Sequence, residues 1–155
     1  MAKTDLAEGQ KAPDFTLLDD KGDEVTLSKF KGKKVILYFY PRDDTPGCTA
    51  EACSFRDGQS DIRKSSAVVL GISADTVESH KSFREKYKLN FPLLSDPDKT
   101  VIQKYGVWKE RSLYGKKLMG IERTTFVIDK NGVIQKIFPQ VKVSGHFEEV
   151  LGSLA

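Results

Sequence analysis

Hydrophobic residues in this chain fall into short runs separated by polar turns, and the spacing in each run predicts an element. Val35–Tyr40 is almost continuously apolar or aromatic, which is typical of a strand buried on both faces of a sheet. Ala67–Ser73 has the same character. The remaining strands are predicted at Asp14–Leu18, Val25–Leu27, Phe91–Leu94, Thr124–Asp129 and Val133–Phe138, the last two joined by a turn containing Asn131-Gly132.

Apolar residues at helical spacing lie between these strands. After the first buried strand, Thr45 suits a helix N-cap and Pro46 the first helical position. The buried face of this helix would carry Cys48, Ala52, Phe55 and Ile62. Three further helices are predicted: one capped by Asp75 with Val77, His80, Phe83 and Tyr87 on one face, one over Asp98–Tyr105, and one from Ser144 with Phe147, Val150, Leu151 and Leu154 on its core face.

The alternation of strands and helices predicts a three-layer α/β/α fold in one domain over residues 1–155. The hairpin near the end makes the central β-sheet mixed, because its strands run antiparallel. A strand–helix–strand unit followed by a hairpin and a closing helix is the thioredoxin-like arrangement. The first two short strands would form an N-terminal β-hairpin extension of it.

The composition of the chain indicates which broad classes of protein it can belong to. The chain has 155 residues, 39% of them hydrophobic and 30% charged, with a net charge of +3, which favours a globular domain and argues against a dedicated nucleic-acid-binding module. The cluster Lys29, Lys31, Lys33 and Lys34 is either a phosphate patch or a solvated loop. No apolar run is long enough for a membrane span. Met1–Gln10 is polar and lacks the apolar segment of a secretory signal, so we expect a cytoplasmic protein.

The segment from Pro41 to Cys53 carries the chemistry. If Thr45 is the N-cap, Cys48 is the third residue of the helix, where unpaired backbone N–H groups and the helix dipole favour the thiolate, which is the reactive form. The loop before such a helix is also where open α/β sheets bind ligands. The position therefore predicts a reactive cysteine. The alternative is that Cys48 is a small buried hydrophobe.

Cys53 lies five residues after Cys48. In an intact α-helix that spacing separates the Cα atoms by about 8.6 Å, whereas a disulfide requires no more than about 7 Å. A bond between the two cysteines would therefore require the helix to unwind. The spacing is not Cys-x-x-Cys, which disfavours simple thiol–disulfide exchange. It suits a thiol that first reacts with an oxidant to give a sulfenic acid.

Three other classes of protein are alternatives to a thiol that reacts with an oxidant. A zinc-binding module could use Cys48, Cys53, His80 and His146, although the histidines lie far apart in sequence. A thioredoxin-like thiol–disulfide oxidoreductase would share the fold but normally carries Cys-x-x-Cys. A nucleotide-binding enzyme is disfavoured, because neither Gly-x-Gly-x-x-Gly nor a P-loop is present.

The segment resembles the active-site motif of the peroxiredoxins, Pro-x-x-x-Thr-x-x-Cys, present here as Pro41, Thr45 and Cys48. Thr-Pro-Gly-Cys-Thr-x-Glu-Ala-Cys is similar to the bacterioferritin-comigratory-protein or PrxQ subfamily. The resemblance extends over essentially the whole chain, including Gly9–Phe15, Tyr105–Trp108 and Arg123–Asp129. It implies a thioredoxin-like fold and the reduction of hydrogen peroxide and organic hydroperoxides, with no metal or organic cofactor.

The resemblance also implies roles for individual residues. Cys48 would be the peroxidatic nucleophile, and Arg123 would stabilise its thiolate and orient the peroxide. The hydroxyl of Thr45 would donate to the substrate and accept from another group, and Pro41 would shield the thiol. Without the resemblance, Arg123 reads as a solvated strand residue, Thr45 as an N-cap only and Pro41 as a strand terminator.

Cys53 would be the resolving cysteine, forming a Cys48–Cys53 disulfide that thioredoxin or a glutaredoxin-like dithiol reduces, and an internal resolving cysteine suits a monomer. Four other side chains are expected to have no direct part in the chemistry. Glu51 is expected to be an acid in the first turn of the helix, His80 a packed histidine and His146 a first-turn residue of the last helix, and neither histidine is expected to act as a base. Trp108 is expected to line the site or pack near it.

Overall fold

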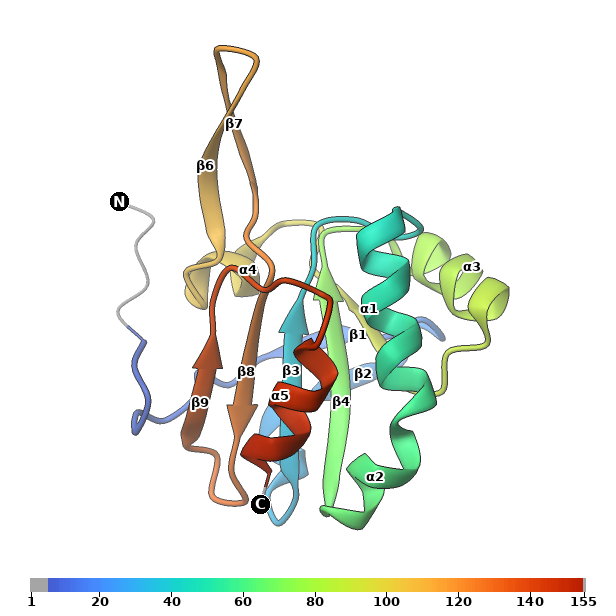
Figure 1. Cartoon of the computed structure of the whole chain (residues 1–155), viewed down its shortest axis with the longest axis vertical. Coiled ribbons are helices and arrows are strands. Elements are labelled where there is room, and N and C mark those ends of the chain that lie inside the picture. Colours follow the sequence, from blue (N-terminus) through green and yellow to red (C-terminus); the bar gives the residue numbers. More distant parts are fainter. Residues whose placement is uncertain (1–5, 155) are drawn as a thin grey trace.

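A seven-stranded mixed sheet forms the centre of the computed structural model, which describes residues 6–154 (Figure 1). Its strand order is β2-β1-β5-β4-β3-β8-β9. β3 pairs parallel with β4 and antiparallel with β8, so the mixed sheet is confirmed. The strands are β1 (Thr16–Leu18), β2 (Glu24–Thr26), β3 (Lys34–Phe39), β4 (Ala67–Ser73), β5 (Leu93–Ser95), β8 (Thr124–Ile128) and β9 (Ile134–Phe138).

Side chains alternate across β3 and divide the interior into two cores. Val35, Leu37 and Phe39 lie in one, and Ile36 and Tyr38 in the other. The second core is covered by α1 (Pro46–Asp57), α2 (Gln59–Lys64), α3 (Val77–Tyr87) and α5 (His146–Ser153). The first is covered by the N-terminal segment, the 3₁₀ turn η1 (Leu27–Phe30) and α4 (Thr100–Lys104). The predicted three layers are therefore present.

Several helix boundaries differ from the predictions, and α4 spans Thr100–Lys104 rather than Asp98–Tyr105. The helix expected to reach Ile62 ends at Asp57, and α2, which carries Ile62, begins after Gly58. A Cβ at Gly58 would lie 2.1 Å from the ring of Phe147, so the close packing of α5 requires glycine there. The N-cap of α3 is Thr76 rather than Asp75, because the Thr76 side chain accepts from the Ser79 N–H. α5 begins after Gly145 rather than at Ser144.

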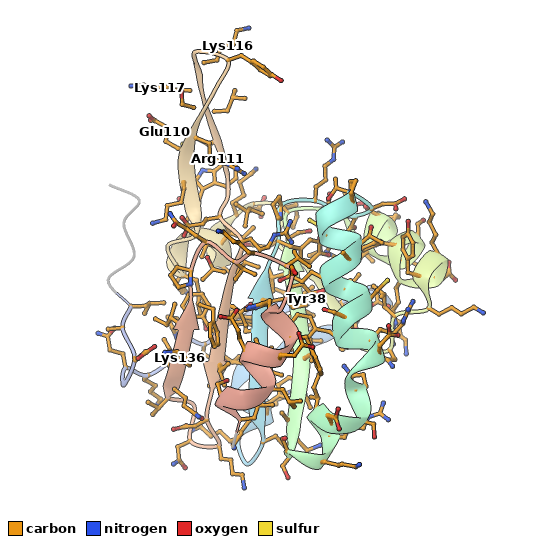
Figure 2. All side chains as sticks on the ribbon, viewed as in Figure 1. Tyr38, Glu110, Arg111, Lys116, Lys117 and Lys136 are labelled. Carbon is orange, nitrogen blue, oxygen red and sulfur yellow. The ribbon has the colours of Figure 1, made fainter. Side chains whose placement is uncertain are left out.

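A second sheet was not predicted at all. β6 (Trp108–Leu113) and β7 (Lys116–Ile121) form a two-stranded hairpin that projects beyond the rest of the molecule (Figure 1). Lys116 and Lys117 lie at its outer end (Figure 2). Most of the hairpin's described side chains are solvated on both faces, so the chain shows no alternation of apolar and polar residues there. Its turn uses left-handed backbone at Tyr114 and Gly115, as a two-residue hairpin turn requires.

Residues 1–5 of the polar N-terminal segment lie outside the described residues. From residue 6 to residue 154, no helix is long and apolar enough to cross a membrane.

Candidate active site

The site begins where β3 ends. The loop 41–45 leads from β3 into α1, with Thr45 in extended backbone at the N-cap and Pro46 at the first helical position, as predicted. The first helical hydrogen bond runs from the Thr49 N–H to the Thr45 carbonyl over 2.8 Å. The N–H groups of Gly47 and Cys48 therefore precede the helix's own ladder and point toward its open end. Cys48 lies here with only 1% of its surface exposed.

Arg123 reaches Cys48 from the neighbouring strand. It immediately precedes β8, which pairs with β3, and its Nη2 donates to Cys48 Sγ over 3.3 Å. Its Nη1 donates to Glu51 Oε1 over 2.6 Å. Burial opposes the charge of Arg123, but Glu51 and Cys48 together raise its pKa above the usual value. The guanidinium is therefore a fixed cation against the sulfur rather than a solvated side chain.

Glu51 is a site residue that the sequence analysis missed. It lies in the second turn of α1, not the first, and is 1% exposed. Burial raises the pKa of Glu51 to about 7, although Arg123 lowers it. Its Oε2 has no hydrogen-bond partner within residues 6–154. The signal was present in the sequence, because a residue three positions after Cys48 shares its helix face.

The Thr45 hydroxyl was expected to donate a hydrogen bond to the substrate, but in the structure its proton is used within the chain. The hydroxyl makes no cap bond and instead donates to the Arg42 carbonyl over 3.0 Å. With its proton used in this way, the oxygen has only lone pairs to offer a ligand. The threonine can therefore accept a hydrogen bond from a substrate in this geometry, but it cannot donate one.

A cleft of about 520 Å³ opens beside the site. Pro41 and Arg123 form one part of its wall, strand β6 over residues 109–112 another, and Gln140 and Val141 a third. The loop thus places Pro41 at the rim next to Arg123, and the hairpin contributes to the wall of the cleft.

Gly47 allows the close approach of Arg123. A Cβ added at this position would lie 3.2 Å from Arg123 Nη2, tighter than an ordinary contact. The absence of a side chain at Gly47 therefore leaves room for the guanidinium to reach the sulfur.

Cys53 lies in the same unbroken helix as Cys48, and both thiols are free. The ideal helical separation of about 8.6 Å between their Cα atoms exceeds what a disulfide can bridge. Cys53 is half-buried, whereas Cys48 is buried. The structure therefore holds the two thiols apart in the reduced protein.

The remaining sequence candidates lie elsewhere. His146 is buried against Thr125 and Glu149, and burial lowers its pKa. Trp108 packs on the core that lies across the sheet from Cys48. Among the described residues, the potential ligand atoms close enough for a metal ion come from Asp43, Asp75 and His80. That group includes neither cysteine, so the four residues that a zinc site would use, Cys48, Cys53, His80 and His146, do not lie together.

A buried cysteine at a helix N-terminus, paired with an arginine just before a strand of a mixed sheet, defines a thiol enzyme on a thioredoxin-like fold. The comparisons specify the family. The AhpC/TSA family model matches residues 8–137, and the chain belongs to that family. It is 60% identical over 146 residues to a putative peroxiredoxin Bcp of Coxiella burnetii, covering 94% of this chain and 97% of that protein. It is 49% identical to peroxiredoxin Bcp of Bacillus subtilis, covering 94% and 93%.

Solved structures agree with this assignment. A PrxQ mutant of Xylella fastidiosa superposes with a TM-score of 0.93 at 37% identity, covering 97% of this chain and 96% of that one. A peroxiredoxin Q of Xanthomonas campestris gives 0.87 at 39% identity, covering 90% and 89%. The thioredoxin-like fold and the resemblance to the Bcp/PrxQ peroxiredoxins are thus confirmed, and the chain is a thiol peroxidase.

Proposed function

We propose that Cys48 is the peroxidatic nucleophile, that Thr45 and Arg123 bind and orient the peroxide, and that Cys53 resolves the oxidised thiol. The observation that carries the proposal is the forked contact of Arg123 with Cys48 Sγ and Glu51 at the N-terminus of α1. The guanidinium and the free N–H groups of the first turn stabilise negative charge on the sulfur and then on the leaving oxygen. Pro41 limits access of bulk water to the sulfur from the rim of the cleft.

The first step transfers one oxygen atom. The Cys48 thiolate attacks the terminal oxygen of the peroxide, the O–O bond breaks, and the leaving oxygen takes a proton and departs as water or an alcohol. Cys48 is left as a sulfenic acid. Arg123 can follow the charge because its fork offers several donors in one plane.

The second step removes that oxygen. The Cys53 thiol attacks the Cys48 sulfur, an S–S bond forms, and the sulfenic oxygen leaves as water. The first turns of α1 must unwind for the sulfurs to meet, as the separation in the intact helix requires. A dithiol reductant, thioredoxin or a glutaredoxin-like protein, then restores both thiols by exchange.

The substrate class is hydrogen peroxide and organic hydroperoxides. A neighbouring structure from Xanthomonas campestris carries alkyl peroxide reduction in its name, which supports the organic substrates. The open cleft beside Arg123 offers room for a substituent on the peroxide. We further propose that the enzyme acts as a cytoplasmic monomer, without a nucleic-acid or membrane partner.

The test is the intact mass of the reduced protein, quenched within seconds of mixing with one equivalent of hydrogen peroxide. We expect a loss of about two mass units, mapped to a Cys48–Cys53 disulfide. A gain of one oxygen would retain the peroxidatic role of Cys48 and remove Cys53 as the resolving thiol. No change in mass would overturn the proposal. Reduction of insulin disulfides by the protein would instead indicate a thiol–disulfide oxidoreductase.

A further inference from the structure

A buried polar network lies directly behind the loop that leads into α1. Asp43, in the middle of this loop, packs against α3 and the end of β4. Its Oδ1 accepts from the Tyr40 hydroxyl over 2.6 Å, and its Oδ2 accepts from the Ser79 hydroxyl over 2.8 Å. His80 Nδ1 lies 2.7 Å from the same Oδ2, with His80 fully buried. Although Asp43, Asp75 and His80 are grouped closely enough to suggest a metal site, the groups that face one another are already bonded within the chain.

His80 bridges the loop and the sheet. Its Nδ1 faces the Asp43 carboxylate, and its Nε2 lies 2.9 Å from the Leu94 carbonyl of β5. Both neighbours of the imidazole are oxygen acceptors, so the two ring nitrogens hold the side chain between the loop and the sheet. His80 is packed in the interior, as predicted, and it also anchors Asp43 to strand β5 of the sheet.

The backbone of the loop is held at one peptide unit. The Asp43 N–H donates to Asp75 Oδ2 over 2.8 Å, and the Arg42 carbonyl accepts from the Thr45 hydroxyl over 3.0 Å. These two groups belong to the same peptide bond, which is planar. Asp75 is itself fixed by the Ser73 hydroxyl at 2.7 Å. Asp75 holds the N–H edge of this peptide, and the contact of Asp43 with His80 holds the residue beside it. Together they fix the carbonyl to which the Thr45 hydroxyl donates its hydrogen bond.

We propose that Asp75 and His80 are positioning residues that make Thr45 a hydrogen-bond acceptor for the peroxide. This inference rests on the proposed function. The oxygen that Cys48 attacks still carries a hydrogen atom, and that hydrogen needs an acceptor when the peroxide is correctly aligned. Thr45 Oγ supplies one only while its own proton is held by the Arg42 carbonyl. The network thereby selects the orientation in which the terminal O–H faces Thr45 and the other oxygen faces the donors of Arg123 and the helix.

The chain offers two conservative pairs of variants. His80→Asn keeps a donor where Nδ1 faces Asp43, and His80→Gln keeps one where Nε2 faces Leu94. Asp75→Asn keeps an acceptor for the Asp43 N–H, and Asp75→Ala removes it. Lys86→Met is the matched control, since it removes an exposed contact between the same loop and the same helix, Lys86 to Asp44, without touching the Arg42–Asp43 peptide.

The measurements are the single-turnover rate constant for oxidation by hydrogen peroxide and, separately, the rate constant for alkylation by iodoacetamide. Alkylation reports the reactivity of the thiolate and needs no acceptor at Thr45. We expect Asp75→Ala and His80→Gln to slow oxidation by about 10- to 100-fold while alkylation stays within about twofold. Asp75→Asn, His80→Asn and Lys86→Met should react at nearly the rate of the unsubstituted protein.

A double-mutant cycle completes the test. Because Asp75 acts through Thr45, Asp75→Ala in a Thr45→Val background should cause no further loss of oxidation rate. Multiplicative effects, a parallel fall in alkylation, or an unchanged rate in Asp75→Ala would each overturn the proposal. If Asp75→Ala does not fold, equal oxidation rates in His80→Asn and His80→Gln would overturn it instead. The proposed function fails only if the unsubstituted protein does not react with peroxide, so the two failures are distinguishable.

Discussion

Arg123 and Glu51 form an ion pair of 2.6 Å in which the carboxylate is almost completely buried and the guanidinium retains only a small exposed surface. The same guanidinium donates to Cys48 Sγ, so Glu51 fixes the cation that faces the reactive sulfur. The pair thereby holds a long, flexible side chain in one orientation, which is what the reaction requires of Arg123. The relationship leads to the first two predictions.

Replacing Glu51 separates its geometric role from its charge. Glu51→Gln keeps an oxygen that can accept from Arg123 Nη1, whereas Glu51→Ala leaves the guanidinium free to turn away from Cys48. We expect Glu51→Ala to lower the rate constant for peroxide reduction by about 100-fold and Glu51→Gln to lower it much less. Stopped-flow measurement of single-turnover oxidation checks this. Equal losses in the two variants would show that the charge of Glu51, not its hold on Arg123, is what matters.

Glu51 should also give the stability of the protein a particular pH dependence. Burial raises its pKa from 4.5 to about 7. Between these two pH values the folded protein keeps a proton that the unfolded chain has lost, so stability falls as the pH rises through this window. The loss attributable to Glu51 is about 3 kcal/mol and is complete above pH 7.

Urea unfolding of the reduced protein at pH 5 and pH 8 measures the effect. Because part of the effect lies below pH 5, Glu51→Gln should lose about 2.5 kcal/mol less between these pH values than the unsubstituted protein. Glu24→Gln, at an exposed position on β2, serves as the control and should change nothing. The same pH dependence in all three proteins would contradict the assignment.

Most of the fold could be predicted because burial leaves a pattern in the sequence. The continuous apolar runs of β3 and β4 and the helical spacing of Cys48, Ala52 and Phe55 reflect contacts with the two cores. The β6–β7 hairpin could not be predicted in this way, since only Trp108 and Ile121, at its two ends, pack on a core and most of its other described side chains are exposed. The break at Gly58 was missed for another reason: the ring that requires glycine there belongs to Phe147, far along the chain.

The site was only partly readable from the sequence. Local rules placed Cys48 at a helix N-terminus, because a cap and a proline are adjacent to it. The role of Arg123 followed from the family resemblance alone, since no local sequence pattern indicates that it contacts Cys48, which lies 75 positions earlier. The network of Asp43 and His80 spans 37 positions and the pair of Glu51 and Arg123 spans 72, so both depend on tertiary contacts that no local pattern encodes.

Adding one methyl group at Gly47 should slow the enzyme while strengthening the helix. Gly47→Ala improves helix propensity by about 0.5–1 kcal/mol, but its Cβ would press on Arg123 Nη2 at 3.2 Å. We expect the guanidinium to shift and peroxide reduction to slow by about tenfold. Gly152→Ala in α5 is the control, because nothing lies within 4 Å of the added atom and the rate should be unchanged. Thermal unfolding and single-turnover oxidation, measured on both variants, would show stability and activity moving in opposite directions only for Gly47→Ala.

Formation of the Cys48–Cys53 disulfide should unwind the first turns of α1. Both cysteines lie in one continuous helix, where about 8.6 Å separates their Cα atoms, so the disulfide and the intact helix exclude each other. Hydrogen exchange should therefore show residues 46–53 protected in the reduced protein and exposed in the oxidised one. Residues 77–87 of α3, to which the loop is anchored by Asp43 and Asp44, should stay protected in both.

Cys53→Ser separates the two steps. The first peroxide should react at the normal rate, because Arg123 donates to Cys48 and Glu51 and the intact helix holds Cys53 apart from Cys48. Continuous turnover with thioredoxin should stop once Cys48 is a sulfenic acid. Hydrogen exchange on this variant after one equivalent of peroxide should find residues 46–53 still protected, since no disulfide draws the helix open. Full turnover without Cys53, or a protected helix in a protein whose Cys48–Cys53 bond is verified by mass, would contradict the coupling of unwinding to resolution.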